Sequence, residues 1–235
     1  NVEVIKINCI PDGNFAHDPE PLDKNLDQLK EEVLKSNSDL GIAVDPDVDR
    51  LVFVSENGET ISEENTLISC ADYILSKEKG SAVSNLSSSM GLRDVCKMYG
   101  VEYFSSMVGE INVVEKMKSV NAIIGGEGNG GIIYPESHYG RDALVGIGLL
   151  LTSLALKNKT ISELFEKLPK YHMLKEKIKI DNDLDFINIK NKLKSTFYNF
   201  SFNEIDGLKI ENNSSWVHVR KSNTEPIIRI YIESK

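Results

Sequence analysis

The sequence predicts an α/β protein in which a mixed sheet of mainly parallel strands carries helices on both faces. Between residues 62 and 156, short apolar or β-branched runs alternate with longer segments of helical periodicity. Such alternation favours parallel strands joined by crossover helices. A partial α/β domain precedes this region, and beyond Pro169 a rise in Lys, Asn and Ile marks a small α+β domain. We therefore expect three units, at residues 1–60, 61–166 and 170–235.

The first unit is predicted to combine strands with one helix. Val2–Ile7 alternates β-branched and polar residues like a strand, and Leu26–Leu34 spaces its apolar residues for a helix. Leu40–Val44 and Leu51–Val54 are strand patterns on either side of an acidic loop, and Glu56–Glu59 carries a hairpin signal. Because domains rarely begin inside a strand, we expect that an N-terminal part of this unit is missing.

The other two units are predicted from the same periodicities. In the central unit, helices are expected at Glu64–Leu75, Leu92–Tyr99, Asn112–Met117 and Arg141–Leu156, and strands at Ala82–Leu86, Val101–Phe104 and Ala122–Gly125. In the last unit, strands are expected at Lys175–Ile180, Lys209–Asn212, Trp216–Arg220 and Ile227–Ile232, and a helix at Phe186–Lys194.

Composition and charge limit the possible partners. The formal net charge is −9, so the long-range field disfavours nucleic acid and anionic membranes. Three widely spaced cysteines form no metal-ligand pattern and favour a reducing setting. No signal-peptide pattern and no membrane-spanning stretch is present in the sequence. We expect a cytoplasmic protein, in which local cations or a metal can still hold a small anion.

An acidic loop is the most informative feature of the chain. It places three carboxylates at alternate positions and then a guanidinium, in the order Asp45, Asp47, Asp49, Arg50. Mg²⁺ prefers oxygen ligands, often a few carboxylates. Alternate positions of a tight turn can converge on one ion, and Pro46 argues against a helix through the loop. The pattern predicts a site for a hard cation, with a solvated Asp-rich turn as the alternative.

Other acidic-loop chemistries fit less well. An EF-hand would use Asp45, Asp47, Asp49 and Glu56 as ligands. It is excluded because Arg50 stands where that loop needs glycine, and because a strand pattern follows directly. An Asp-x-Asp motif after an apolar strand also resembles the nucleophile loop of haloacid-dehalogenase-type phosphatases. In that alternative Asp45 would be the nucleophile.

A glycine-rich loop, residues 125–131, follows the strand pattern that includes Ile124. Its glycines let the backbone approach a ligand closely, and Glu127 and Asn129 offer hydrogen bonds to hydroxyl groups. At the C-terminal edge of a parallel sheet, such a loop suits a polyhydroxylated ligand. A flexible linker is the alternative, which the embedded acid and amide disfavour.

A basic turn, residues 220–226, lies between two strand patterns near the C-terminus, with Arg229 downstream. It combines two cations, two hydroxyls and an amide, which are suitable groups for binding phosphate. A capped surface turn is the alternative, but in an acidic chain this local concentration favours phosphate. His138–Asp142, which precedes the long apolar helix, is interpreted as a helix cap with a salt bridge or as a ligand contact.

The three loops, in this order and at these separations, resemble the α-D-phosphohexomutase superfamily, which includes phosphoglucomutase, phosphomannomutase and phosphoglucosamine mutase. Asp45–Arg50 is similar to its Asp-Gly-Asp-x-Asp-Arg metal loop, with Pro46 in place of glycine. Gly126–Gly130 resembles its Gly-Glu-x-Ser/Asn-Gly sugar loop. Arg220–Pro226 is similar throughout to its Arg-x-Ser-Gly/Asn-Thr-Glu-Pro phosphate loop. The resemblance covers essentially the whole chain.

The resemblance implies reversible phosphate transfer between the 1- and 6-positions of a hexose, through a bisphosphate intermediate and a Mg²⁺-bound phosphoserine. It implies that Asp45, Asp47 and Asp49 hold Mg²⁺ and that Arg50 is the catalytic residue that stabilises the phosphoryl group. The form of the sugar loop favours glucosamine or mannose phosphate. Val108–Glu110 resembles the family's third-domain contact loop. The implied substrate-binding residues are Gly109, Glu110, Glu127, Asn129, Arg220, Ser222, Asn223, Thr224 and Arg229.

The chain also departs from the family pattern. The family's Ser-His-Asn-Pro phosphoserine motif is absent from the sequence, so the chain is expected to match the later part of the second domain and all of the third and fourth, and to be inactive alone. Many members have His directly after the sugar loop, where this chain has Gly131, so no general base is assigned. A non-catalytic sugar-phosphate-binding module remains an alternative. The phosphatase alternative leaves the loop at Arg220 unexplained.

Overall fold

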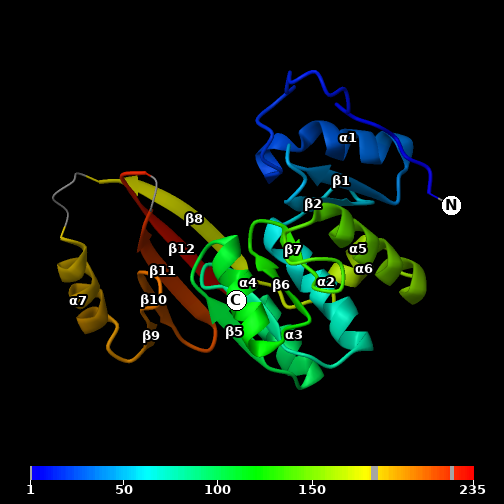
Figure 1. Cartoon of the computed structure of the whole chain (residues 1–235). Helices are drawn as coiled ribbons and strands as arrows, with labels where there is room; N and C mark the ends of the chain where they lie inside the picture. Colours follow the sequence, from blue (N-terminus) through cyan, green and yellow to red (C-terminus); the bar gives the residue numbers. More distant parts are fainter. Residues whose placement is uncertain (1, 181–184, 223–224) are drawn as a thin grey trace.

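The computed structural model describes residues 2–180, 185–222 and 225–235. Figure 1 shows an N-terminal unit in blue, a central unit of helices around a sheet, and a C-terminal sheet in yellow to red. The central unit lies against both of the others. Within the described ranges, no helix is long and apolar enough to cross a membrane.

The N-terminal unit is a small antiparallel sheet covered by one helix. Its elements are η1 (Asp23–Asn25), α1 (Asp27–Ser36), β1 (Leu40–Val44), β2 (Leu51–Ser55) and β3 (Thr60–Ile61). The strands pair in the order β1-β2-β3. Val33 of α1 packs with Leu26, Val52 and Val54 in a small core, and α1 ends at Asn37 in the left-handed conformation that favours Asn. The helix and the strands around the acidic loop are confirmed.

The strand expected at Val2–Ile7 is wrong. Residues 2–22 form neither helix nor strand, and Val2, Val4 and Ile5 are exposed. A strand requires a neighbouring backbone that exchanges hydrogen bonds with it. The sheets of the described residues include no partner for this segment. Its β-branched alternation is therefore a local preference that nothing in the described structure satisfies.

The central unit alternates helices and strands as predicted. Its elements are α2 (Glu63–Lys77), β4 (Ala82–Asn85), α3 (Gly91–Tyr99), β5 (Tyr103–Ser106), α4 (Glu110–Val120), β6 (Ile124–Glu127), β7 (Gly131–Ile133), α5 (Ala143–Lys157) and α6 (Ile161–Phe165). The sheet order is β5-β4-β6-β7. β4 pairs in parallel with β5 and β6, whereas β7 returns antiparallel to β6. This is the expected mixed sheet.

Alternation along the strands places helices on both faces of this sheet. Ala82 packs into the larger core with residues of α2, α3 and α5, whereas its neighbour Val83 packs into a second core with α4. Ile132 and Ile133 of β7 divide in the same way. Since successive side chains of a strand point to opposite faces, each strand buries residues on both. The near-continuous apolar runs of the sequence follow from this double burial.

The C-terminal unit is an antiparallel sheet with one helix. Its elements are β8 (His172–Lys179), α7 (Phe186–Thr196), β9 (Ser201–Asn203), β10 (Leu208–Glu211), β11 (Ser215–Lys221) and β12 (Ile227–Ser234). The strand order is β8-β12-β11-β10-β9, so the first strand of the unit pairs with the last. The small α+β architecture is confirmed.

Buried polar groups join the C-terminal sheet to the central unit. Glu233, 1% exposed, accepts hydrogen bonds from the backbone N–H of Met90 (2.8 Å) and from Nε1 of Trp216 (2.6 Å). Lys209 donates to the carbonyl of Leu86 (2.8 Å), and burial lowers the pKa of Lys209 to about 8. These contacts fix one sheet face against the loop that follows β4.

A buried histidine adds a further bond at this interface. Nδ1 of His218 lies 2.8 Å from Oγ of Ser87, and its Nε2 lies 2.6 Å from the carbonyl oxygen of Asp206. Burial lowers the pKa of His218 to about 4, so the ring is neutral at neutral pH. Because a carbonyl only accepts, Nε2 carries the proton and Nδ1 accepts from the serine hydroxyl.

Replacing Glu233 by Ala is expected to destabilise the chain by about 3 kcal/mol, because two buried donors lose their acceptor. Urea unfolding followed by circular dichroism measures the change. The exposed Glu204, which pairs with Lys190 and Lys194, provides the matched control, and Glu204→Ala should cost far less. Equal effects of the two substitutions would contradict a buried bridge at Glu233.

Candidate functional site

The acidic loop joins the antiparallel strands β1 and β2, and its backbone is folded around Asp45. One oxygen of Asp45 accepts hydrogen bonds from the backbone N–H groups of Asp49 (3.0 Å) and Arg50 (2.9 Å). Val48 has a φ of 60°, in the left-handed region that a β-branched residue rarely adopts. The loop is therefore held in a tight turn rather than left as an open connection.

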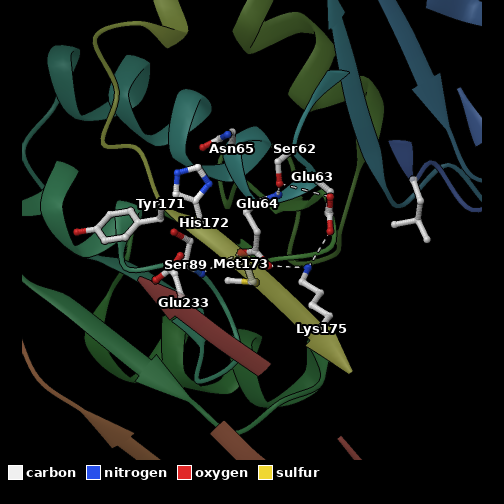
Figure 2. A pocket seen from close by; sticks show the side chains of 11 residues that line it. Ser62, Glu63, Glu64, Asn65, Ser89, Tyr171, His172, Met173, Lys175 and Glu233 are labelled. Atoms are coloured by element: carbon white, nitrogen blue, oxygen red, sulfur yellow. Dashed lines mark hydrogen bonds and ion pairs between the residues drawn. The ribbon is translucent and has the colours of Figure 1, made fainter. Parts of the chain in front are cut away.

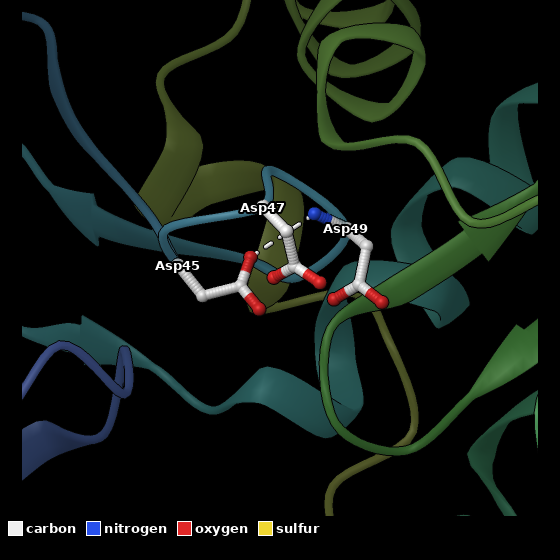
Figure 3. Close-up of side chains that lie close together, drawn as sticks. All are labelled: Asp45, Asp47 and Asp49. Carbon is white, nitrogen blue, oxygen red and sulfur yellow. Dashed lines mark hydrogen bonds between the residues drawn. The ribbon is translucent and has the colours of Figure 1, made fainter.

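The turn brings the three predicted metal ligands together. Carboxylate oxygens of Asp45, Asp47 and Asp49 lie within 4.8 Å of one another, and Figure 3 shows the three side chains gathered on one side of the loop. Oδ1 of Asp49 is buried and has no hydrogen-bond partner among the described residues. An all-oxygen cluster with an unsatisfied buried carboxylate oxygen fits a hard divalent cation.

The electrostatics of the loop also fit a cation. Burial, reinforced by the neighbouring Asp45, raises the pKa of Asp49 to about 6, against the opposing effect of Arg141. Burial acts in the same direction on Asp45, but the hydrogen bonds from Arg50 and Asp49 outweigh it and leave the pKa of Asp45 lowered. Asp45 thus stays ionised, whereas ionisation of Asp49 is disfavoured. A bound cation would offset the repulsion between the two carboxylates.

Arg50, the predicted catalytic residue, lies at the edge of this cluster. Its Nε is 3.6 Å from an oxygen of Asp45 and 3.6 Å from an oxygen of Asp49. Its Nη1 is 2.5 Å from both carboxylate oxygens of Glu20, in the segment before α1. Glu20 is a partner that sequence reasoning missed, because no pattern links that irregular segment to the acidic loop.

The glycine-rich loop is the turn between β6 and β7, and it touches the acidic loop through the backbone. The N–H of Leu51 donates to the carbonyl of Gly130 (3.2 Å). Gly130 has a φ of 89°, and a Cβ there would lie 2.5 Å from the carbonyl oxygen of Leu51. Only glycine meets both requirements, so the close approach of the two loops depends on this residue.

Glu127 lies at the end of β6, buried among donors. Its Oε1 accepts from Nδ2 of Asn85 (2.7 Å) and from the backbone N–H of Gly109 (3.0 Å), and its Oε2 lies 3.1 Å from Nη1 of Arg141. Asn129 instead folds back on the loop, where its Oδ1 accepts from the N–H of Gly131 (3.2 Å). The structure thus joins the predicted contact loop at Gly109 to the predicted sugar loop.

Arg141 lies at the centre of the site, although the sequence placed it only within His138–Asp142, interpreted as a helix cap with a salt bridge or as a ligand contact. Its guanidinium contacts Asp49 of the acidic loop, Glu110 (3.0 Å) and Glu127 (3.1 Å). Its neighbour Asp142 caps α5 by accepting from the N–H groups of residues 144 and 145, and pairs with His138 (2.9 Å). The cap and salt bridge are confirmed. Nothing in the local sequence around Arg141 indicates that its guanidinium contacts three carboxylates from other segments.

Lys175 of β8 contacts the backbone of the glycine-rich loop. Lys175 donates to the carbonyl of Gly128 (2.8 Å) and pairs with Glu63 (2.8 Å) and Glu64 (2.7 Å), as Figure 2 shows for the two acids. Burial raises the pKa of Glu64 to about 7. Burial also disfavours charged Lys175, but the attraction of both carboxylates outweighs it and raises the pKa of Lys175. These side chains line a cavity of about 420 Å³.

The basic turn joins β11 to β12, and the two predicted arginines lie opposite each other on these strands. Arg220 and Arg229 are cross-strand partners of β11 and β12, and Nε of each is buried without a hydrogen-bond partner in the described part of the chain. Arg229 pairs with Glu225 (2.8 Å), and Arg220 lies 4.0 Å from Asp206, which accepts from the N–H of Val108 (3.0 Å). Like charges placed opposite each other suit an anion between them.

Ser222 lies in the same turn, where its backbone N–H donates to the carbonyl of Ile227 (2.9 Å). Asn223 and Thr224, also predicted to bind phosphate, lie outside the described residues. β11 ends and β12 begins at the outer end of the C-terminal sheet, where the arrow of β8 also ends (Figure 1). The structure therefore joins the acidic, glycine-rich and contact loops directly, whereas Arg220 reaches the contact loop through Asp206.

Comparison with known proteins follows the same three units. Residues 1–58 match the model of phosphoglucomutase/phosphomannomutase alpha/beta/alpha domain II. Residues 62–171 match alpha/beta/alpha domain III of that family, and residues 172–235 match its C-terminal domain. The chain belongs to the α-D-phosphohexomutase superfamily. Membership of this superfamily removes the haloacid-dehalogenase alternative.

Individual relatives agree with the family. The chain is 37% identical over 235 residues to the phosphoglucomutase/phosphomannomutase of Thermococcus kodakarensis, covering 99% of this chain and 52% of that protein. It is 35% identical over 228 residues to the phosphoglucosamine/phosphogalactosamine mutase of Sulfurisphaera tokodaii, covering 94% of this chain and 50% of the relative. The chain therefore spans about half the length of the relatives that it matches.

A solved structure shows the same fold. A phosphoglucomutase/phosphomannomutase family protein of Burkholderia thailandensis superimposes with a TM-score of 0.77 at 23% identity, over 90% of this chain and 46% of that one. Because the superposition spans 90% of this chain, it includes residues of all three units.

Replacing Lys175 by Met is expected to destabilise the chain by about 3 kcal/mol at about pH 8, because Glu64 is left buried without its cation. The folded-state pKa of Glu64 already exceeds its ordinary value and rises further without Lys175, so the folded state binds the proton more tightly than the unfolded state. The loss of stability should therefore shrink as the pH falls toward about 5.5.

Urea unfolding at both pH values measures this effect. Lys159→Met is the matched control, because Lys159 pairs with Glu163 at the surface. A loss that is the same at both pH values, or no larger than that of the control, would show that Lys175 does not neutralise a buried acid.

Proposed function

We propose that this chain provides the metal, sugar and phosphate loops of a phosphohexomutase, an enzyme that transfers phosphate between the 1- and 6-positions of a hexose phosphate. The observation that carries the proposal is the convergence of the acidic and glycine-rich loops, through Arg141 and through the backbone bond from Leu51 to Gly130, in a chain of this superfamily. A cation-binding cluster thereby lies beside a loop suited to sugar hydroxyls.

Asp45, Asp47 and Asp49 would hold Mg²⁺. Their all-oxygen cluster supports this assignment, as does Oδ1 of Asp49, which has no hydrogen-bond partner within the described ranges. When bound, Mg²⁺ stabilises negative charge on a phosphoryl group in transfer. Arg50 lies beside the cluster with Nε toward it, so its guanidinium can share that stabilisation as the catalytic residue of this chain.

The remaining predicted residues would bind the substrate. Glu127 and Asn129 offer acceptors and donors for sugar hydroxyls, with Gly109 and Glu110 beside them. A second group of residues would hold the phosphate that does not react: Arg220, Ser222, Asn223, Thr224 and Arg229. The Nε atoms of the two arginines, which are buried and have no hydrogen-bond partner among the described residues, support an anion there. The arrangement suits a hexose phosphate and its bisphosphate.

Glucosamine and mannose phosphates are the proposed substrates, from the form of the sugar loop and from the names of the relatives. The phosphoryl donor would be a phosphoserine that this sequence does not contain. A non-catalytic sugar-phosphate-binding module is the second candidate, favoured by the absence of the phosphoserine motif from these residues. The turnover of a protein that includes the missing motif distinguishes the two.

The acidic loop is expected to bind Mg²⁺ more weakly as the pH falls through about 6. Asp49 has a raised pKa of about 6, so below this pH it is protonated and no longer offers a carboxylate to the cation. Isothermal titration calorimetry at about pH 8 and about pH 5 measures the difference, which should reach about tenfold or more. Asp49→Asn should remove the pH dependence and most of the affinity.

The exposed Asp39 provides the control, because Asp39→Asn changes the same charge outside the cluster. Binding that does not depend on pH, or that survives Asp49→Asn, would contradict the metal assignment.

The 235-residue chain is expected to bind glucose 1,6-bisphosphate but to turn over neither glucosamine 6-phosphate nor mannose 1-phosphate. Arg220→Ala should weaken the binding about tenfold, because a charge-assisted contact to phosphate is lost. Calorimetry and a coupled product assay measure binding and turnover, with unphosphorylated glucose as the control ligand. Failure to bind the bisphosphate would overturn the proposed function. Turnover by the chain alone would overturn the hypothesis that the phosphoryl donor is a phosphoserine outside this sequence.

A further inference from the structure

Gly131 and Arg141 share one space beside the sugar loop. A Cβ added to Gly131 would lie 2.3 Å from Cδ of Arg141, closer than real Cβ atoms approach. It would also make tight contacts with Cγ of Arg141 (3.0 Å) and Oδ1 of Asn129 (3.1 Å). Gly131 begins β7 and is not among the residues with positive φ, so its backbone does not itself require glycine. The reason for glycine here is therefore steric: the stem of Arg141 occupies the place of a side chain at position 131.

The Arg141 stem leads to a guanidinium that contacts carboxylates from three different segments. Nη2 contacts Asp49, Nε lies 3.0 Å from Glu110, and Nη1 lies 3.1 Å from Glu127. The side chain is only 14% exposed. A planar guanidinium can direct N–H groups to several acids at once, whereas a lysine ammonium lacks this fixed geometry.

We propose that Arg141 is a positioning residue that couples the metal loop to the sugar loop, and that Gly131 is required because it leaves room for the Arg141 stem. The inference rests on the proposed function. Arg141 holds Asp49 by one oxygen, which leaves the other oxygen for a cation, and it orients Glu127 toward sugar hydroxyls. Because a guanidinium stays protonated, Arg141 does not take over the acid–base role of the histidine that many members carry at the position of Gly131.

Arg141 is expected to affect the affinity for Mg²⁺ and the affinity for the sugar ligand in opposite directions. The Arg141 cation lies against a metal ligand, so it opposes the binding of a second cation through charge repulsion. The same cation holds Glu127 in place, so it favours the sugar ligand. Displacing Arg141 should strengthen Mg²⁺ binding and weaken bisphosphate binding. General loosening of the fold would weaken both.

The test uses Gly131→Ala, Arg141→Ala and the double variant of the full chain. At about pH 8, calorimetry with Mg²⁺ alone and with glucose 1,6-bisphosphate gives two affinities for each. Gly131→Ala should weaken bisphosphate binding about tenfold and strengthen Mg²⁺ binding severalfold, because the new Cβ pushes Arg141 away. In the Arg141→Ala background, Gly131→Ala should change neither affinity further.

Controls separate this inference from the proposed function. Gly148→Ala is the matched control, because a Cβ at the exposed Gly148 of α5 meets no atom within 4 Å. Thermal unfolding of the same variants should show that Gly131→Ala destabilises the wild-type chain but not the Arg141→Ala chain. Additive effects, or two affinities that fall together, would overturn the inference. If the wild type does not bind the bisphosphate, the proposed function fails, whereas the Mg²⁺ affinities and the unfolding cycle still decide the inference.

Discussion

The candidate site depends on the guanidinium of Arg141, which offsets the negative charge of the carboxylates around it. Acidic side chains from the acidic loop, the start of α4 and the end of β6 converge there in a chain whose net charge is already −9. Buried carboxylates repel one another strongly, since the protein interior screens charge poorly. One cation that touches all three acids makes their convergence possible. Arg50 provides a similar balance at the outer edge of the acidic loop.

Backbone contacts support this electrostatic arrangement. The N–H of Leu51 bonds to Gly130, and the N–H of Ala143 bonds to the carbonyl of Val48 (3.0 Å), so the acidic loop is tied to both the sugar loop and the start of α5. Val48 and Gly130, whose carbonyls accept these two bonds, both have a positive φ. Such conformations persist only where the surrounding structure determines them, and they are commonly found at functional sites.

Much of the architecture could be predicted from the sequence. The strands on either side of Asp45–Arg50, the alternation of the central unit and the small C-terminal sheet all follow from local periodicity, because each element buries one face or both. The segment Val2–Ile7 shows the limit of that argument. Its alternation is as regular as that of a true strand, but pairing depends on a neighbouring backbone, which no local pattern contains.

For the site, the sequence was enough to single out the acids of the acidic loop, Glu127 and the basic turn as candidates, because their residue types are grouped within short loops. The folded structure was needed to show that Arg141 joins Asp49 to Glu127, that Glu20 faces Arg50, and that the stem of Arg141 lies against Gly131. These relations connect residues far apart in the chain. An ion pair leaves no periodic signal in the sequence. The space beside Gly131 is filled by Arg141, so the need for a small residue there is visible only when both are seen together.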